Sequence, residues 1–179
     1  MTLAVGVATL RALAQLGLAD LALKWPNDVL HAGRKLGGIL CELRLEAAGP
    51  AYVVIGVGLN VRLPEAARRA IRADGGLTAT DLASALDAAE FPSRVRLAAA
   101  LIDQLVAMAL AFEANGFAPF LSEWRRADAL RDRPVRVLAH DSARDGIARG
   151  IDTDGLLRVE VDGRLERLAA GEVTLRSVA

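Results

Sequence analysis

Residues 24–40 read KWPNDVLHAGRKLGGIL, and this stretch decides how the chain is interpreted. It holds both lysines of the protein, Lys24 and Lys35, whereas every other basic residue among the 22 lysines and arginines is an arginine. A lysine ammonium is a compact charge that can follow a moving group, while an arginine guanidinium is a flat, bulky fork. The two lysines therefore either perform a task that arginine cannot, or lie together by chance on a solvated hairpin.

The turn Trp25-Pro26-Asn27-Asp28 has an unusual composition. Pro26 lacks a backbone donor and pushes Trp25 toward extended geometry. Asn27 and Asp28 carry short polar side chains that can fold back onto the turn or reach into a pocket. The apolar residues 21–23 predict a short buried strand, so the turn begins at the edge of a sheet.

A β-hairpin is predicted to follow this turn. Its arms are residues 29–30 and 36–45, and Gly33 between them accepts a positive φ at little cost. The hairpin returns Lys35 to the neighbourhood of the polar turn. Gly38 then lies inside a strand, where the missing side chain lets a ligand approach closely.

Residues 52–61, YVVIGVGLNV, predict another strand. The segment is almost continuously apolar, which favours a central strand covered on both faces. Asn60 ends it, and an amide there needs hydrogen-bond partners. The amide either caps the loop at the strand end or recognises an adenine edge, to which it can donate and accept at once. Gly56 and Gly58 do not form a dinucleotide fingerprint, because no third glycine opens a helix after them.

Three of these motifs, in this order and spacing, closely resemble the catalytic domain of the biotin protein ligase, or biotin–[acetyl-CoA-carboxylase] ligase, family. They are KWPNDV (24–29), RKLGGIL (34–40) and GVGLNV (56–61). The tail resembles the small C-terminal β-barrel of that family in RPVRV (133–137), GIARGIDTDGLLRVE (146–160) and AGEVTLR (170–176). The resemblance implies an α+β fold in two domains. Residues 1–132 would form a class II synthetase-like catalytic domain, an incomplete mixed sheet with helices, and residues 133–179 a small SH3-like β-barrel.

Helical patterns account for most of the remaining chain before residue 128. Residues 2–16 are apolar nearly all round, so this helix needs partners on several sides. Residues 64–73 predict a basic helix with Arg68, Arg69 and Arg72 directed outward. Further expected features are a helix capped by Thr80-Asp81 and running to residue 89, the longest helix from Ser93 to Asn115-Gly116, a helix over 117–126 with Trp124 packed between domains, and a linker over 128–133.

From Pro134 onward the apolar residues recur with a period of two. Asp154-Gly155 and Asp162-Gly163 are strong signals for tight turns. Several short strands in this length predict a small barrel by pattern alone.

The resemblance implies a two-step, ATP-dependent reaction, with ATP, Mg²⁺ and biotin as ligands. The biotin carboxylate would attack the α-phosphorus of ATP, and a lysine of a carrier protein would then displace AMP. Lys35 is the implied catalytic residue, because its ammonium would bridge the biotin carboxyl oxygen and the α-phosphate. Lys24 is expected at the surface of its strand. The other implied contacts are Gly38 and Leu40 to biotin, Asn60 to adenine, Asn27 and Asp28 to the phosphates or their magnesium, and Glu172 and Arg176 to the nucleotide.

The composition limits the partners. With 53% hydrophobic residues, 25% charged residues and zero formal net charge, the chain is expected to be globular and not to bind DNA. It shows no signal peptide and no uncharged run long enough to span a bilayer, so a cytoplasmic protein without a membrane partner is expected. His31 and His140 lack ligand spacing, so no metal site is predicted, and the single Cys41 is expected in the core. The implied partner is the biotin carboxyl carrier domain of acetyl-CoA carboxylase, and a homodimer is a further candidate.

Members of the resembled family carry, upstream of the position of Met1, the first strands of the catalytic domain and a Gly/Arg-rich loop that closes over the adenylate. No part of these 179 residues matches that segment. The expectation is an incomplete ligase that exposes its N-terminal helix and its sheet edges and transfers no biotin on its own. Two alternatives remain open, a lipoate-type ligase and a non-catalytic fragment with a carrier-binding or dimerising surface.

Overall fold

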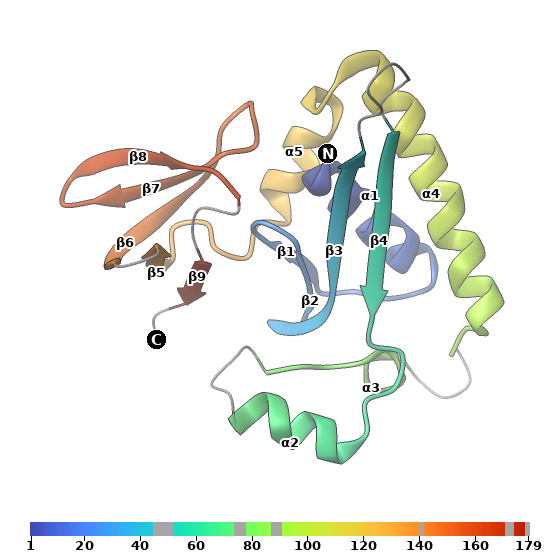
Figure 1. Cartoon of the computed structure of the whole chain (residues 1–179). Helices are drawn as coiled ribbons and strands as arrows, with labels where there is room; N and C mark the ends of the chain where they lie inside the picture. The colour runs from blue at the N-terminus through green and yellow to red at the C-terminus, as the bar shows by residue number, and fades with distance from the viewer. Residues whose placement is uncertain (45–51, 74–77, 87–90, 140–141, 171–173, 178–179) are drawn as a thin grey trace.

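The computed structural model describes residues 1–44, 52–73, 78–86, 91–139, 142–170 and 174–177. Its N-terminal part contains a four-stranded sheet in the order β1-β2-β3-β4, with helices α1, α4 and α5 on one side (Figure 1). All of its strand pairs are antiparallel, and the expected mixed character is limited to isolated parallel bridges of Leu23 with Asp128 and of Lys35 with Ala79. The strands are β1 (Leu21–Lys24), β2 (Asp28–His31), β3 (Arg34–Arg44) and β4 (Tyr52–Leu59).

The predicted hairpin is confirmed. Strands β2 and β3 are joined through Ala32 and Gly33, whose φ angles of 47° and 71° both lie in the left-handed region. Such a two-residue turn matches the twist of the flanking strands and fixes their register. Asp28 consequently pairs with Gly38, and a register shift between Val29 and Leu30 adjusts the strand next to the turn.

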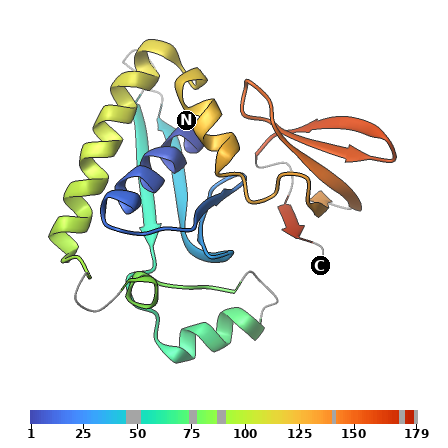
Figure 2. The ribbon, with the colours of Figure 1, turned by 180° about the vertical axis from the view of Figure 1, so that it is seen from behind.

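Helix α1 (Thr2–Gln15) lies at the centre of the N-terminal part, and this corrects one expectation. Ala4, Val5, Val7 and Leu13 are fully buried, so the helix does not expose apolar faces. Helices α4 and α5, from about a hundred residues further along the chain, cover it together with the sheet (Figure 2). The predicted need for partners on several sides is therefore met within this chain.

The other helices lie close to their predicted positions. They are α2 (Glu65–Ala73), α3 (Leu82–Ala85), α4 (Arg94–Asn115) and α5 (Ala118–Arg126). Asp81 caps α3 by accepting from the backbone of Ser84, Ser93 caps α4 by accepting from Arg96, and α4 ends at Gly116 with a φ of 62°. Helix α3 ends before residue 89, because Leu86 is already extended.

The outward direction predicted for Arg68 is wrong. Its guanidinium lies 2.6 Å from the carboxylate of the buried Asp81 and donates to Ser84 as well. A buried carboxylate needs a partner, and Arg68 on α2 supplies one. Arg69 is exposed as expected, and the side chain of Arg72 lies outside the described part.

The prediction that residues 52–61 form a strand covered on both faces is also wrong. Strand β4 ends the order of the sheet, and its residues alternate between exposed and half-buried. Tyr52 and Val54 lie on the open face, whereas Ile55 and Val57 pack against the hydrophobic core on the other face. The prediction failed because glycines rather than polar residues occupy two of the open-face positions, Gly56 and Gly58. The sequence therefore lacks the apolar–polar alternation that is typical of a strand covered on one face.

A second sheet follows, in the order β8-β7-β6-β5-β9. Among the described residues, each strand is paired with its neighbour in this order, and no ladder joins the two end strands, β8 and β9. Asp162 and Gly163 make the predicted turn, with φ angles of 50° and 74°. The strands are β5 (Pro134–Ala139), β6 (Ser142–Ile151), β7 (Leu157–Val161), β8 (Arg164–Leu168) and β9 (Thr174–Ser177).

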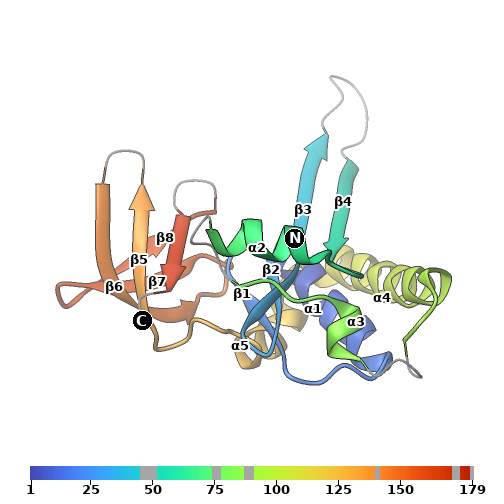
Figure 3. The ribbon, with the colours of Figure 1, turned by 90° about the horizontal axis from the view of Figure 1, so that it is seen from below.

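The predicted linker at 128–133 is held to both sheets. The Leu23 amide in β1 donates to the carbonyl oxygen of Ala127, and the Ala129 amide donates back to that of Leu23. The Asp132 amide donates to the carbonyl oxygen of Ala148 in β6. Figure 3 shows the second sheet beside the hairpin end of the first, with the long β3–β4 ribbon projecting away from it. A domain boundary at residue 132 remains a proposal.

Candidate functional site

The turn before β2 is fixed at both ends. Trp25 is buried, and its Nε1 donates to the carbonyl oxygen of Gly155 in the second sheet at 3.1 Å. Asn27 is bound to β3, because its side-chain Nδ2 donates to the carbonyl oxygen of Ile39 at 3.0 Å and its backbone carbonyl oxygen accepts from the Ile39 amide at 2.9 Å. No sequence pattern predicted the contact with Gly155, which lies 130 residues away. The turn is therefore a rigid support for Asp28.

Asp28 lies between the two lysines of the chain. One carboxylate oxygen is 2.5 Å from Nζ of Lys35, and the other is 3.9 Å from Nζ of Lys24. The side chains of Lys24 and Asp28 are only 13% and 14% exposed, whereas that of Lys35 is 43% exposed. The surface position predicted for Lys24 is wrong, and the predicted approach of Lys35 to the turn is confirmed.

Burial has an electrostatic consequence for Lys24. Desolvation lowers the pKa of Lys24, the carboxylate of Asp28 raises it in part, and the nearby ammonium of Lys35 lowers it further. Lys24 thus helps to hold Asp28 from the buried side, while Lys35 reaches the same carboxylate from the open side. This arrangement leaves Lys35 as the lysine of the pair with access to a ligand.

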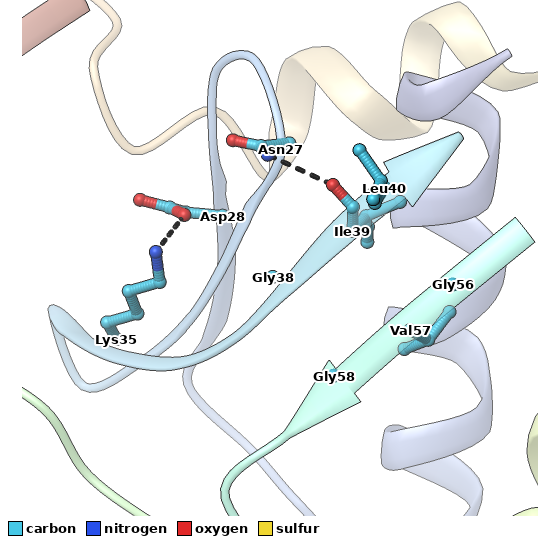
Figure 4. A pocket seen from close by; sticks show the side chains of 9 residues that line it. All are labelled: Asn27, Asp28, Lys35, Gly38, Ile39, Leu40, Gly56, Val57 and Gly58. Carbon is cyan, nitrogen blue, oxygen red and sulfur yellow. Dashed lines mark hydrogen bonds and ion pairs between the residues drawn. The ribbon is translucent and has the colours of Figure 1, made fainter. Parts of the chain in front are cut away.

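A cavity of about 450 Å³ opens over Lys35 and the outer face of β3 and β4. Its floor is largely backbone, because Gly38 pairs with Gly58 and Leu40 pairs with Gly56 on this face, so that Leu40 alone of these four residues has a side chain. Figure 4 shows Lys35 and Asp28 at one end of the cavity and Leu40 at the other. Its lining residues are Asn27, Asp28, Lys35, Gly38, Ile39, Leu40, Gly56, Val57 and Gly58.

The glycine floor was only partly predictable. Gly38 and Leu40 were predicted as ligand contacts, whereas no ligand contact was predicted for Gly56 and Gly58, whose pattern does not fit a dinucleotide fingerprint. Their spacing of two places both on one face of a strand, and this was the available signal. A Cβ on Gly56 or Gly58 would meet its nearest neighbour at 3.6 or 3.7 Å, an ordinary contact, so packing of the fold does not require glycine there. An open floor for a ligand explains these glycines better than packing does.

A second cavity, of about 660 Å³, adjoins the first and shares Asn27, Ile39 and Leu40 with it. Its wall is mostly apolar and includes Trp25 and Phe117. The two cavities together give the site a charged end at Lys35 and an apolar end toward α1 and the second sheet.

The side-chain amide of Asn60 bridges the backbone of Lys35 and Thr80, and we call this arrangement the clamp. Its Nδ2 donates to the carbonyl oxygens of Thr80 at 3.1 Å and Lys35 at 3.4 Å. Residues 78–80 also pair with Lys35, because the Lys35 amide donates to Thr78 and the Thr80 amide donates to Lys35. These bonds match the strand-cap alternative. Recognition of adenine stays a prediction. Only Oδ1 of Asn60 could bond to adenine without breaking the hydrogen bonds that Nδ2 makes to Thr80 and Lys35.

The segment behind Lys35 is anchored by Asp81, a residue predicted only as a helix cap. Burial alone would raise the pKa of Asp81, but hydrogen bonds from Leu63, Ser84 and Arg68 outweigh burial and lower it. Asp81 therefore remains ionised and ties three separate segments together.

Two residues of the C-terminal part, Glu172 and Arg176, were also predicted to contact the nucleotide. Arg176 pairs with Arg136 in the β5–β9 ladder, but its side chain lies outside the described residues, as do Glu172 and His140 entirely. Among the residues that are described, no three His, Cys, Asp or Glu side chains form a metal-binding group. Cys41, expected in the core, is only partly buried.

Comparison with known proteins identifies the family. Residues 2–60 match the model of the biotin/lipoate A/B protein ligase family, and residues 132–176 match that of the biotin protein ligase C-terminal domain. The biotin–[acetyl-CoA-carboxylase] ligase of Paracoccus denitrificans is 31% identical over 179 residues, which cover 93% of this chain and 70% of that protein. The chain belongs to the biotin protein ligase family. The resemblance seen in the sequence motifs is thus confirmed.

Other members of the biotin protein ligase family are longer. The bifunctional ligase/repressor BirA of Salmonella typhimurium is 38% identical over 177 residues, which cover 99% of this chain and 53% of that protein, so the chain spans about half its length. A structure of the biotin protein ligase from Aquifex aeolicus, in complex with biotin and ATP, covers 99% of this chain with a TM-score of 0.79 and 20% identity. This structural match supports the two-part biotin protein ligase fold.

Proposed function

We propose that this chain carries the Lys35 site and the C-terminal domain of an ATP-dependent biotin protein ligase, which forms biotinyl-5′-AMP and transfers biotin to a lysine of a carboxyl carrier domain. The observation that carries the proposal is the Lys35–Asp28 pair at the end of a cavity floored by glycine backbone. The Paracoccus and Aquifex relatives are named as biotin ligases, and the latter was solved with biotin and ATP. The match to a C-terminal domain model specific to biotin protein ligases favours biotin over lipoate.

In the first step, an oxygen of the biotin carboxylate attacks the α-phosphorus of ATP, a P–O bond forms, and pyrophosphate leaves. Negative charge accumulates on the oxygens around phosphorus, so a fixed positive charge there lowers the barrier. Lys35 is suited to this role because its ammonium is half-exposed at the cavity. Asp28 holds that ammonium in place from one side.

In the second step, the uncharged ε-amine of a carrier lysine attacks the acyl carbon of the adenylate, and AMP leaves. Lys35 would again face the oxygens that gain charge. Gly38, Gly56 and Gly58 would let the planar or extended parts of the ligand lie directly on the strands, and Leu40 would contact its apolar chain. The apolar neighbouring cavity offers further space at this end.

Magnesium would enter with the phosphates of ATP as part of the substrate. Mg²⁺ is commonly held by one or two carboxylates together with substrate phosphates. Asp28 is the carboxylate at the cavity, but both of its oxygens lie near lysine ammonium groups. We therefore assign Asp28 mainly to positioning Lys35, and Asn27 and Arg176 to contacts with the nucleotide.

The proposal is tested with purified chain, ATP, Mg²⁺ and biotin, by measuring biotinyl-5′-AMP and pyrophosphate with and without biotin. The equilibrium binding of added biotinyl-5′-AMP is measured in parallel, so that recognition of the intermediate is separated from turnover. Addition of a carrier domain then tests the expectation that this chain alone transfers no biotin. A chain that neither forms nor binds the adenylate would overturn the proposed function.

A further inference from the structure

The turn between β6 and β7 reaches across to the candidate site. The carbonyl oxygen of Gly155 accepts from Nε1 of Trp25 at 3.1 Å, and Trp25 is only 2% exposed. A Cβ built on Gly155 would lie 2.9 Å from Cδ1 of Leu3 in α1, so the turn also lies against this helix. Residues 154–156 line the larger, apolar cavity. This turn of the second sheet therefore forms part of the wall of the site.

A network of charged side chains holds the turn in shape. Oδ1 of Asp152 accepts from the amides of Asp154 and Leu156 at 2.9 and 3.0 Å, so this carboxylate closes the turn from within. Arg167 in β8 donates to Asp152 through Nε and to Asp154 through Nη2, both at 2.6 Å. Burial alone would raise the pKa of Asp152, but these hydrogen bonds outweigh burial and lower it. Asp152 therefore stays ionised, and one guanidinium bridges two carboxylates at the turn.

The contact at Gly155 leads to Lys35 through the turn that begins at Trp25. Residues 25–28 form one short turn, so the indole at its start and the carboxylate of Asp28 at its end are held relative to each other. The bond to Gly155 fixes the start of this turn, and the two bonds of Asn27 to β3 fix its middle. Lys35 has a flexible four-carbon side chain, and its ammonium lies against Asp28. The position of that ammonium thus depends on both supports.

We infer that Asp152 and Arg167 are positioning residues of the adenylate site. They fix the 152–156 turn, which holds Trp25 through Gly155 and thereby sets the place of Asp28 and Lys35. The inference rests on the proposed function and gives the second sheet a role that needs no contact with the ligand. A buried indole N–H needs a hydrogen-bond partner, and the Gly155 oxygen supplies it. Small displacements of a charged group in such a site are costly for the reaction.

A matched pair of glycine variants tests the role of the turn. Gly155 and Gly163 both follow an aspartate in a turn of the second sheet, with φ angles of 82° and 74°, but a Cβ on Gly163 would meet nothing within 4 Å. Both Gly155→Ala and Gly163→Ala should lower stability in urea because of backbone strain. Only Gly155→Ala should also weaken the binding of biotinyl-5′-AMP, by roughly two- to tenfold, which is the value of one hydrogen bond.

A second pair tests the charged network without backbone strain. Arg167→Ala should weaken adenylate binding over the same range, and Arg167→Lys should recover part of the affinity because an ammonium still pairs with one carboxylate. Arg144→Ala is the control, since it breaks a pair with Glu166 that lies in the same sheet and is exposed to a similar degree. It should leave the affinity unchanged. A purely structural role of Arg167 would give both alanine variants the same affinity as the wild type.

The position of the lysine is read without ligand by NMR. The chain has two tryptophans, so Trp25→Phe assigns the indole N–H resonances. In Arg167→Ala the Trp25 indole N–H should exchange faster with solvent and the amides of Asp28 and Lys35 should shift, whereas Arg144→Ala should change neither.

Unaltered Trp25, Asp28 and Lys35 signals in Arg167→Ala, or full adenylate affinity in that variant beside a wild type that binds, would overturn the inference alone. A wild-type chain that binds no adenylate, although the shifts occur in Arg167→Ala, would overturn the proposed function and with it the role of the turn in the ligase site.

Discussion

Replacement of Asn60 by alanine separates the two interpretations of this residue. In the structure its Nδ2 donates to Thr80 at 3.1 Å and to Lys35 at 3.4 Å. The first distance is that of a normal hydrogen bond and the second is long. Lys35 keeps the amide of Thr80 as a donor, whereas the Thr80 oxygen loses the donor described for it. At about 0.5–1.5 kcal/mol for a hydrogen bond, Asn60→Ala should lower the free energy of unfolding by about 1–2 kcal/mol.

For a chain of this size, that loss corresponds to a fall in Tm of about 2–8 °C. Urea unfolding gives the free energy, and calorimetric titration gives the affinities for ATP and biotin. Because the clamp positions the backbone of Lys35, both affinities should weaken together. Asn115→Ala is the matched control, since that amide makes one long bond of 3.5 Å on the exposed end of α4. Unchanged stability with a selective loss of about 1–3 kcal/mol in ATP binding would refute the clamp and favour recognition of adenine.

Four further outcomes are expected. Lys35→Ala and Lys35→Arg should each slow adenylate formation at least about a hundredfold, because a guanidinium cannot take the compact position of the ammonium. A normal rate in the arginine variant would show that Lys35 is not the catalytic residue. Gly56→Ala should fold normally yet weaken adenylate binding, whereas Gly37→Ala should destabilise the fold because its Cβ would clash with Gly58. Asp81→Ala should cost about 3–5 kcal/mol by removing the carboxylate that caps α3 and pairs with Arg68. Because the pKa of Asp81 is lowered, its contribution should be present above pH 3.8 and vanish as the pH falls through the lowered value. Burial raises the pKa of Asp128, so the folded state holds the carboxyl proton more tightly than the unfolded state does. The free energy of unfolding should therefore decline as the pH rises from 3.8 through the raised value. Urea unfolding at several pH values should show no such decline in Asp128→Asn, and an identical slope in the variant would contradict the assignment.

The local features of the site were predictable from sequence. A two-residue turn at Ala32 and Gly33 sets the register of β2 and β3, so the approach of Lys35 to Asp28 followed from the motif alone. Helix caps at Asp81 and Ser93 were likewise found, because capping depends on residues close in sequence.

The features that were missed depend on distant partners. The clamp of Asn60 joins Thr80, 20 residues away, and the bond of Trp25 joins Gly155, 130 residues away. Arg68 was placed outward because a basic helix usually faces solvent, and nothing local indicated that Asp81 would be buried next to it. The cover of α1 by α4 and α5 was hidden for the same reason. Sequence patterns give the periodicity of an element, and they do not give which later segment packs against it.

The most direct test of the proposed site is an NMR titration of the amide-labelled protein with biotinyl-5′-AMP, repeated with Gly56→Ala. The intermediate carries the acyl chain, phosphate and adenine together, so its contacts map the whole cavity. The account predicts saturable binding, with the largest shifts at Lys35, Gly38, Gly56 and Gly58, and clearly weaker binding by the variant. An absence of binding, or shifts confined to the second sheet with full affinity in Gly56→Ala, would contradict the assignment of this cavity to the ligase reaction.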